Sequence, residues 1–153
     1  MPPHTLSNQE ISDRIQIQDL LTRYTVAIDT KDWSLLDTCF TPDAEVDYTS
    51  TGGIKGAYPE VRKWLEQALS IFPMTVHFIS NSTVTLEGDR ATARTYVLNP
   101  MGFKNPDGSL HLFTVGGTYN DRLVRTADGW RIAARSEEQA FMQGTLPEAL
   151  LRR

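Results

Sequence analysis

The sequence predicts an α+β fold in which helices pack on one face of a curved, mostly antiparallel sheet. Two observations support this prediction. Apolar residues recur at helical spacing in much of residues 7–70, whereas later residues alternate apolar and polar in long runs separated by hairpin signals. A sheet crossed by helices leaves a hollow between the layers, so we expect the fold to enclose an apolar pocket.

Three N-terminal helices are expected. The sequence of residues 7–10 is a capping box, and apolar residues at helical spacing continue the first helix to about Asp29. Asp32 has the position of an N-cap for a short second helix, which Thr41-Pro42-Asp43 should end. A proline in the first turn of residues 58–70 marks the third helix.

The expected strands cover residues 44–51, 75–87, 90–103, 110–125 and 130–139. The turn signals Gly88-Asp89 and Thr126-Ala127-Asp128-Gly129 divide the last four strands into two hairpins. Because no linker or internal repeat interrupts the chain, residues 1–153 are expected to form a single domain. Its core should cover about residues 8–140, followed by a C-terminal tail over residues 141–153.

Composition excludes several classes of protein. A net charge of −4 without a cluster of Lys and Arg argues against a nucleic-acid-binding protein. No apolar run approaches the roughly 20 residues that span a bilayer, and the N-terminus lacks a signal-peptide pattern. We therefore expect a cytoplasmic protein that does not associate with membranes.

A metal site is not expected either. The single cysteine, Cys39, rules out an intramolecular disulfide and any multi-cysteine metal site. Asp29, His77, Glu87 and His111 do not have the spacing that zinc motifs share. The chemistry expected below also needs no organic cofactor.

Asp29 and His77 are the leading candidates for catalysis. Asp29 lies at the end of the first predicted helix, and His77 lies near the start of a strand-like run. A carboxylate beside a histidine orients the ring and favours its use as a general base near neutral pH. The spacing of the two residues does not by itself show that they meet.

Three short motifs resemble the SnoaL-like branch of the nuclear-transport-factor-like cone fold, and scytalone dehydratases in particular. Asp29-Thr30-Lys31-Asp32-Trp33, Val46-Asp47-Tyr48 and Val76-His77-Phe78-Ile79 are similar to dehydratase motifs in the same order. Bile acid 7α-dehydratases and hexachlorocyclohexane dehydrochlorinases are also similar, with an Asp on the first helix and a His after the third. The resemblance, over about residues 11–138, implies a cone-shaped α+β barrel and a His77 base held by Asp29.

The resemblance also implies roles for other residues. Tyr48 matches the tyrosine through which the dehydratases act, by way of water, on the substrate oxygen, and Tyr24 is similar to a pocket tyrosine of the bile acid enzymes. Scytalone itself is not the expected substrate, because Ile28 and Asn99 replace a tyrosine and a histidine of that pattern. The residues expected to bind substrate are Ile28, Trp64, Phe78, Asn99, Tyr119 and Arg135.

Strand alternation bears on two of these candidates. A two-residue turn at Gly88-Asp89 places Pro100 opposite His77 and turns Asn99 to the other face, which a single bulge would reverse. Strict alternation in the last strand places Arg135 on one face with Arg131.

The expected function is that of a cofactor-free lyase or isomerase, resembling a dehydratase, that removes a proton from a hydrophobic cyclic or polycyclic substrate. The alternatives are a protein of this fold that binds a small molecule without chemistry, a polyketide cyclase-like protein, and an assembly subunit. A homodimer or homotrimer is also expected, formed through the outer face of the sheet.

Overall fold

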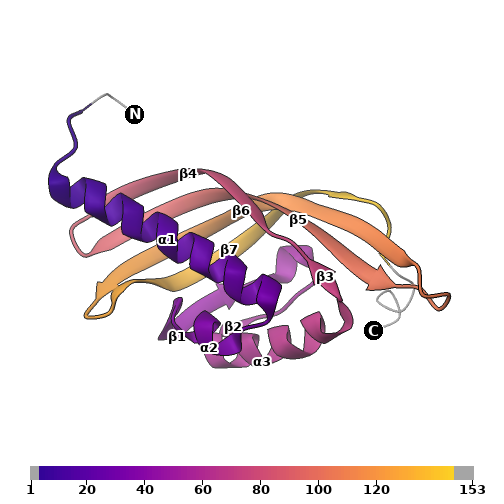
Figure 1. Cartoon of the computed structure of the whole chain (residues 1–153). Coiled ribbons are helices and arrows are strands. Elements are labelled where there is room, and N and C mark those ends of the chain that lie inside the picture. The colour runs from indigo at the N-terminus through magenta and orange to yellow at the C-terminus, as the bar shows by residue number, and fades with distance from the viewer. Residues whose placement is uncertain (1–3, 147–153) are drawn as a thin grey trace.

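The structure is a computed structural model that describes residues 4–146 (Figure 1). Its helices are α1 (Asn8–Thr30), α2 (Trp33–Asp37) and α3 (Tyr58–Ala68), with 3₁₀ turns η1 (Thr49–Thr51) and η2 (Leu69–Ile71). Figure 1 shows the long helix α1 lying obliquely across the strands, with α2 and α3 grouped near one end. The structure thus has the expected layering, with helices on one face of a sheet.

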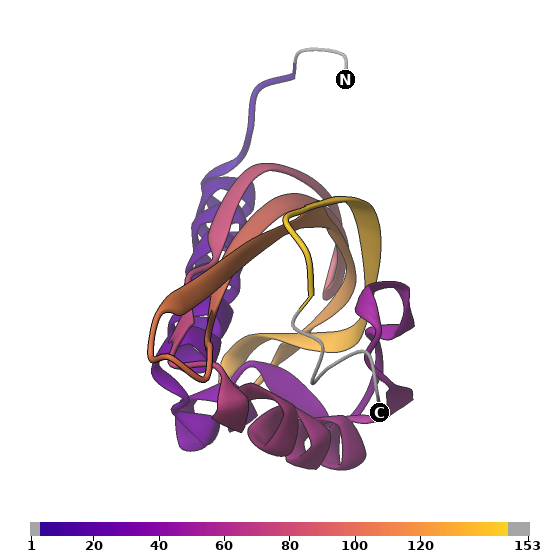
Figure 2. The same ribbon diagram turned by 90° about the vertical axis from the view of Figure 1, so that its right-hand side faces the viewer.

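The strands form one seven-stranded sheet in the order β2-β1-β7-β6-β5-β3, and β4 also pairs with β5. They are β1 (Phe40–Asp47), β2 (Lys55–Ala57), β3 (Met74–Thr75), β4 (Phe78–Glu87), β5 (Arg90–Lys104), β6 (Leu110–Thr126) and β7 (Gly129–Gln143). Only β1 and β7 pair in parallel. Figure 2 shows that the sheet curves around an interior flanked by α1 and α3 and does not close into a barrel.

The first helix forms as its sequence predicts. Ser7 Oγ accepts a hydrogen bond from the Glu10 amide at 3.2 Å, and the Ser7 amide donates to Glu10 Oε2 at 2.8 Å. The apolar side of α1 is buried against the sheet through Ile17, Leu20, Leu21, Tyr24, Ala27 and Ile28. Lys31 ends the helix in the left-handed conformation.

The second helix is shorter than expected, and the three helices are not consecutive. Phe40, expected on the apolar side of α2, is the first residue of β1, so β1 and β2 separate α2 from α3. Pro42, expected to end a helix, lies inside β1 where the register with β7 shifts between Phe40 and Glu45. A proline is tolerated there because it does not have to donate a ladder hydrogen bond.

Two other boundaries differ from the sequence prediction. The strand expected over residues 75–87 is divided into β3 and β4, with Val76 and His77 between them. The last strand is longer than expected and ends at Gln143, so the predicted tail begins inside β7, and residues 147–153 lie outside the described part.

Two β-bulges decide which side chains face the interior. In β4 the register with β5 shifts between Ser80 and Thr83, where Asn81 has a φ of 51°. In β7 the neighbouring residues Arg122 and Leu123 of β6 pair with Ala134 and Ile132, so Ala133 is the extra residue. Each bulge reverses the alternation of the side chains that follow it.

The outer face of the sheet is partly apolar. Phe78, Tyr96, Leu98 and Phe141 are exposed there, and Phe78 and Leu98 are direct cross-strand partners. Association through this face, as a dimer or trimer, stays a prediction. Within residues 4–146, no helix combines the length and the apolar character needed to cross a membrane.

A buried ion pair attaches α1 to the hairpin of β6 and β7. The Asp13 carboxylate, 5% exposed, accepts hydrogen bonds from Arg125 Nη1 and Nη2 at 2.6 and 2.8 Å and from Trp130 Nε1 at 3.1 Å. The Arg125 hydrogen bonds lower the pKa of Asp13 to about 2, against the opposing effect of burial. Because this pKa is depressed on folding, the pair stabilises the fold above the ordinary aspartate pKa and loses its effect as pH falls.

We expect Asp13→Asn to lower the free energy of unfolding by about 2 kcal/mol at neutral pH, because the buried charge pair is lost. Asp89→Asn is the matched control, since Asp89 binds the same Arg125 at 2.8 Å but is 82% exposed. Urea unfolding between about pH 2 and pH 7 measures both effects. Stability of the wild type should fall more steeply in acid than that of Asp13→Asn. Equal losses in the two variants would contradict the prediction.

Candidate functional site

Asp29 and His77 meet at the end of α1. Asp29 Oδ1 lies 2.6 Å from His77 Nδ1, and Asp29 Oδ2 accepts the His77 backbone N–H at 2.8 Å. One carboxylate therefore fixes both the ring and the main chain of His77, which lies between β3 and β4. The His77 side chain is 5% exposed and that of Asp29 is 23% exposed. The pair expected from the sequence is in hydrogen-bonding contact.

Asn99 lies beside the other ring nitrogen of His77. The bulge at Asn81 moves Asn99 to the face of β5 on which His77 lies, so the strict hairpin register is wrong here. The amide is satisfied when its nitrogen donates to the Val76 carbonyl at 3.1 Å and to Thr75 Oγ1 at 3.0 Å. Its oxygen then lies 3.2 Å from His77 Nε2. Both ring nitrogens therefore face oxygen atoms.

Tyr24 and Tyr48 form a hydrogen-bonded pair of hydroxyl groups. Their oxygens lie 2.7 Å apart in the interior, and the ring of Tyr24 meets the His77 ring edge to face at 6.4 Å between centroids. Burial raises the pKa of both phenols, that of Tyr48 well above its ordinary value. They remain protonated at neutral pH and can act as hydrogen-bond donors.

Arg135 is buried beside the two tyrosines. The bulge at Ala133 turns it to the interior, away from the face of Arg131 on which strict alternation places it. Its Nε and Nη2 donate to the Asp121 carboxylate at 2.7 and 2.8 Å. Its guanidinium carbon lies 4.1 Å from the ring centres of both Tyr24 and Tyr119. Although Arg135 is fully buried, its Nη1 has no hydrogen-bond partner among the described residues.

Glu137 belongs to the same cluster, and sequence reasoning did not single it out. It follows Arg135 by two positions on β7, so the bulge also turns Glu137 inward, and it pairs in register with buried Tyr119. Glu137 Oε2 accepts a hydrogen bond from Thr51 Oγ1 at 3.0 Å. A signal for it existed in the sequence, because any register that places Arg135 inside also places Glu137 inside.

The structure places the remaining candidates, Ile28, Trp64 and Phe78, in three different environments. Ile28 is packed in the core. Trp64 is half-buried and lies against Gly53, where a Cβ would come within 2.7 Å of its ring. Phe78 is 59% exposed on the outer face of the sheet and does not reach the cluster.

The polar groups that meet in the interior are called the interior polar cluster below. It consists of Tyr24, Asp29, Tyr48, His77, Asn99, Tyr119, Asp121, Arg135 and Glu137. It occupies the place where the sequence predicts an apolar pocket. The bulge in β7 directs the charged side chains of this cluster inward.

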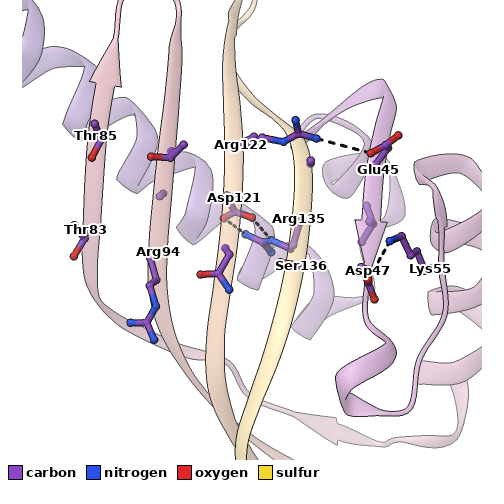
Figure 3. Close-up of a pocket in the computed structure, with 15 residues that line it drawn as sticks. Glu45, Asp47, Lys55, Thr83, Thr85, Arg94, Asp121, Arg122, Arg135 and Ser136 are labelled. Carbon is purple, nitrogen blue, oxygen red and sulfur yellow. Dashed lines mark hydrogen bonds and ion pairs between the residues drawn. The ribbon is translucent and has the colours of Figure 1, made fainter.

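A groove of about 500 Å³ lies instead on the outer face of the sheet (Figure 3). Four of its charged residues form two ion pairs, Arg122 with Glu45 at 3.8 Å and Lys55 with Asp47 at 3.6 Å. Asp121 and Arg135 of the interior polar cluster also line this groove. It offers no histidine or cysteine, and the interior polar cluster is the better candidate for chemistry. In residues 4–146, no group of three His, Cys, Asp or Glu side chains could hold a metal ion.

Comparison with known structures identifies the fold. A scytalone dehydratase-like protein of Novosphingobium aromaticivorans superposes with a TM-score of 0.81 at 19% identity, over 93% of each chain. The hexachlorocyclohexane dehydrochlorinase LinA-type3 from Novosphingobium barchaimii superposes with a TM-score of 0.74 at 17% identity, over 88% of this chain and 91% of that one. Both have the nuclear-transport-factor-like fold, with its curved, unclosed sheet.

Sequence comparison identifies the family. An uncharacterised protein of Mycobacterium tuberculosis is 46% identical over 138 residues, which are 90% of this chain and 92% of that protein. The SnoaL-like domain matches residues 9–136, nearly the whole described chain. The protein therefore belongs to the SnoaL-like family.

Proposed function

We propose that the protein is a cofactor-free lyase or isomerase of the dehydratase type, and that His77 is its general base. The substrate would be a hydrophobic cyclic molecule with a carbonyl group. The observation that carries the proposal is the 2.6 Å hydrogen bond between Asp29 Oδ1 and His77 Nδ1. The reaction class is supported by relatives in fold that are named for a scytalone dehydratase and for a hexachlorocyclohexane dehydrochlorinase.

In this proposal Asp29 holds one tautomer of the ring. When Nδ1 donates its proton to the carboxylate, the neutral ring presents the lone pair of Nε2 to a substrate. Asn99 lies at Nε2, so its amide has to turn aside when substrate binds. After proton transfer, the Asn99 oxygen can return to accept a hydrogen bond from the protonated nitrogen.

Two groups can stabilise the oxyanion that forms when the carbon loses its proton. In the tyrosine pair one hydroxyl donates to the other, which leaves the second O–H free to donate to the substrate oxygen. The unpartnered Nη1 of Arg135 supplies a positive charge in the same region. Preorganised donors in a buried site stabilise a developing oxyanion strongly.

A second function, binding without chemistry, has one observation in its favour. The His77 ring is 5% exposed and Tyr24 and Tyr48 are buried, so the cluster is closed to large molecules until side chains move. The unpartnered Arg135 Nη1 would still attract a polar group of a ligand. This function predicts heat of binding in calorimetry and no product after long incubation.

We expect ¹⁵N NMR of labelled histidine to show the neutral His77 ring as the Nδ1-protonated tautomer, because Asp29 accepts that proton. Asp29→Ala should convert the neutral ring to a mixture with the Nε2-protonated tautomer. Asp32→Ala is the control, since Asp32 caps α2 through the Leu35 amide and does not contact His77. An unprotonated Nδ1 in the wild type would contradict the assignment.

We expect His77→Gln to lower kcat by about 10²–10⁴-fold on a cyclic β-hydroxy ketone that the wild type dehydrates, because the base is removed. Asp29→Asn should lower kcat by a smaller factor. The absorbance of the enone product measures the rate, and His111→Gln is the control, because His111 lies on β6 and binds the Thr145 carbonyl. A His77→Gln protein with full turnover would refute the proposed function.

A further inference from the structure

Glu137 is the acidic group of the interior polar cluster that His77 chemistry does not use. Its position depends on the β7 bulge, which turns Glu137 to the face of buried Arg135 and Tyr119. Thr51 Oγ1 holds Oε2 at 3.0 Å, and Oε1 accepts no hydrogen bond from the described part of the chain. The residue is only partly buried.

The charges around Glu137 come from several elements. Burial raises its pKa, and the Thr51 hydrogen bond and the positive charges of His77 and Arg135 oppose this effect without cancelling it. Its charge also raises the pKa of Tyr24, Tyr48 and Tyr119. The carboxyl group is therefore held protonated to a higher pH than an exposed glutamate, and its neighbours are the residues proposed to act on substrate.

We propose that Glu137 is the acid that protonates the leaving group in the reaction for which His77 is the base. This inference rests on the proposed function. A β-elimination of water needs an acid as well as a base, because hydroxide is a poor leaving group unless it receives a proton. His77 comes from the β3–β4 connection and Glu137 from β7, so the two groups reach the cluster from different strands.

The step balances in atoms and electrons. His77 Nε2 takes the proton from the carbon next to the carbonyl, and the electrons of that C–H bond form an enolate whose oxygen accepts hydrogen bonds from the tyrosine pair. The enolate then collapses to a C=C bond, and the C–O bond to the leaving hydroxyl breaks. Glu137 gives its proton to that oxygen, which departs as water. His77 loses its proton to solvent, and Glu137 regains one from solvent.

A pair of substrates with different leaving groups tests the assignment. A cyclic β-hydroxy ketone loses hydroxide and needs an acid, whereas its β-acetoxy analogue loses acetate, which leaves without a proton. We expect Glu137→Gln, which retains an acceptor for Thr51, to slow loss of water by about 10²-fold or more and to leave loss of acetate nearly unchanged. Loss of water should also decline as pH rises through the raised pKa of Glu137. Glu138→Gln is the control, because Glu138 is the next residue and is exposed.

The two proposals fail in different ways. If Glu137→Gln slows both leaving groups equally, Glu137 has a positioning role only and the inference is overturned. If His77→Gln changes neither rate, the proposed function fails. A test without substrate uses ¹³C NMR of labelled glutamate carboxyl groups, with the Glu137 signal assigned from Glu137→Gln. A Glu137 carboxyl group that ionises at a higher pH than an exposed glutamate side chain agrees with the inference, and one that ionises at the same or a lower pH overturns it.

Discussion

The buried guanidinium of Arg135 is the group on which the interior of this protein depends. A charge removed from water costs several kcal/mol unless it is paired and hydrogen-bonded. Asp121 supplies the pairing from the neighbouring strand, and the guanidinium carbon lies 4.1 Å from the ring centres of both Tyr24 and Tyr119. Because Tyr24 belongs to α1, this contact helps to fix how the helix lies on the sheet. Polar groups therefore occupy space in the interior that a purely apolar core would fill.

The same arrangement explains why three tyrosines can be buried here. Each phenol needs a partner for its hydroxyl or a favourable contact for its ring when water is excluded. Tyr24 and Tyr48 satisfy each other, and the guanidinium interacts with the ring faces of Tyr24 and Tyr119. Asp29 and Asn99 do the same for His77. The polar groups of the cluster are satisfied largely by one another, although Arg135 Nη1 has no partner among the described residues.

Local signals in the sequence predicted most of the fold. The capping box of α1, the proline of α3 and the turn at Gly88-Asp89 each specify a boundary through short-range chemistry. The bulges are different, because an extra residue in a strand depends on what the neighbouring strand requires. Asn81 is a partial exception: asparagine tolerates positive φ, and its position between two serines could have indicated the bulge in β4. Ala133 offers no comparable signal.

The same contrast between local signals and bulges applies to the residues of the candidate site. The contact between Asp29 and His77 could be expected only from a resemblance, because the spacing of the two residues does not show that they meet. Asn99, Arg135 and Glu137 could not be placed with confidence by alternation, since each lies beyond a bulge that reverses it. Phe78 is the opposite case. It follows His77 directly, and its side chain points to the outer face.

The hydrogen bond between Asp29 and His77 has a consequence for folding. It joins residues 48 positions apart and encloses α2, β1, β2 and α3 in one loop of chain. Closing a loop of this length has an entropic cost that local structure does not repay, so such contacts form late. The contact between Asp29 and His77 then depends on the docking of α1 beside the β3–β4 connection, and a partly folded chain with a complete β5–β7 meander would still lack it. A spectroscopic signal from this hydrogen bond would report folding of the N-terminal half more faithfully than circular dichroism would.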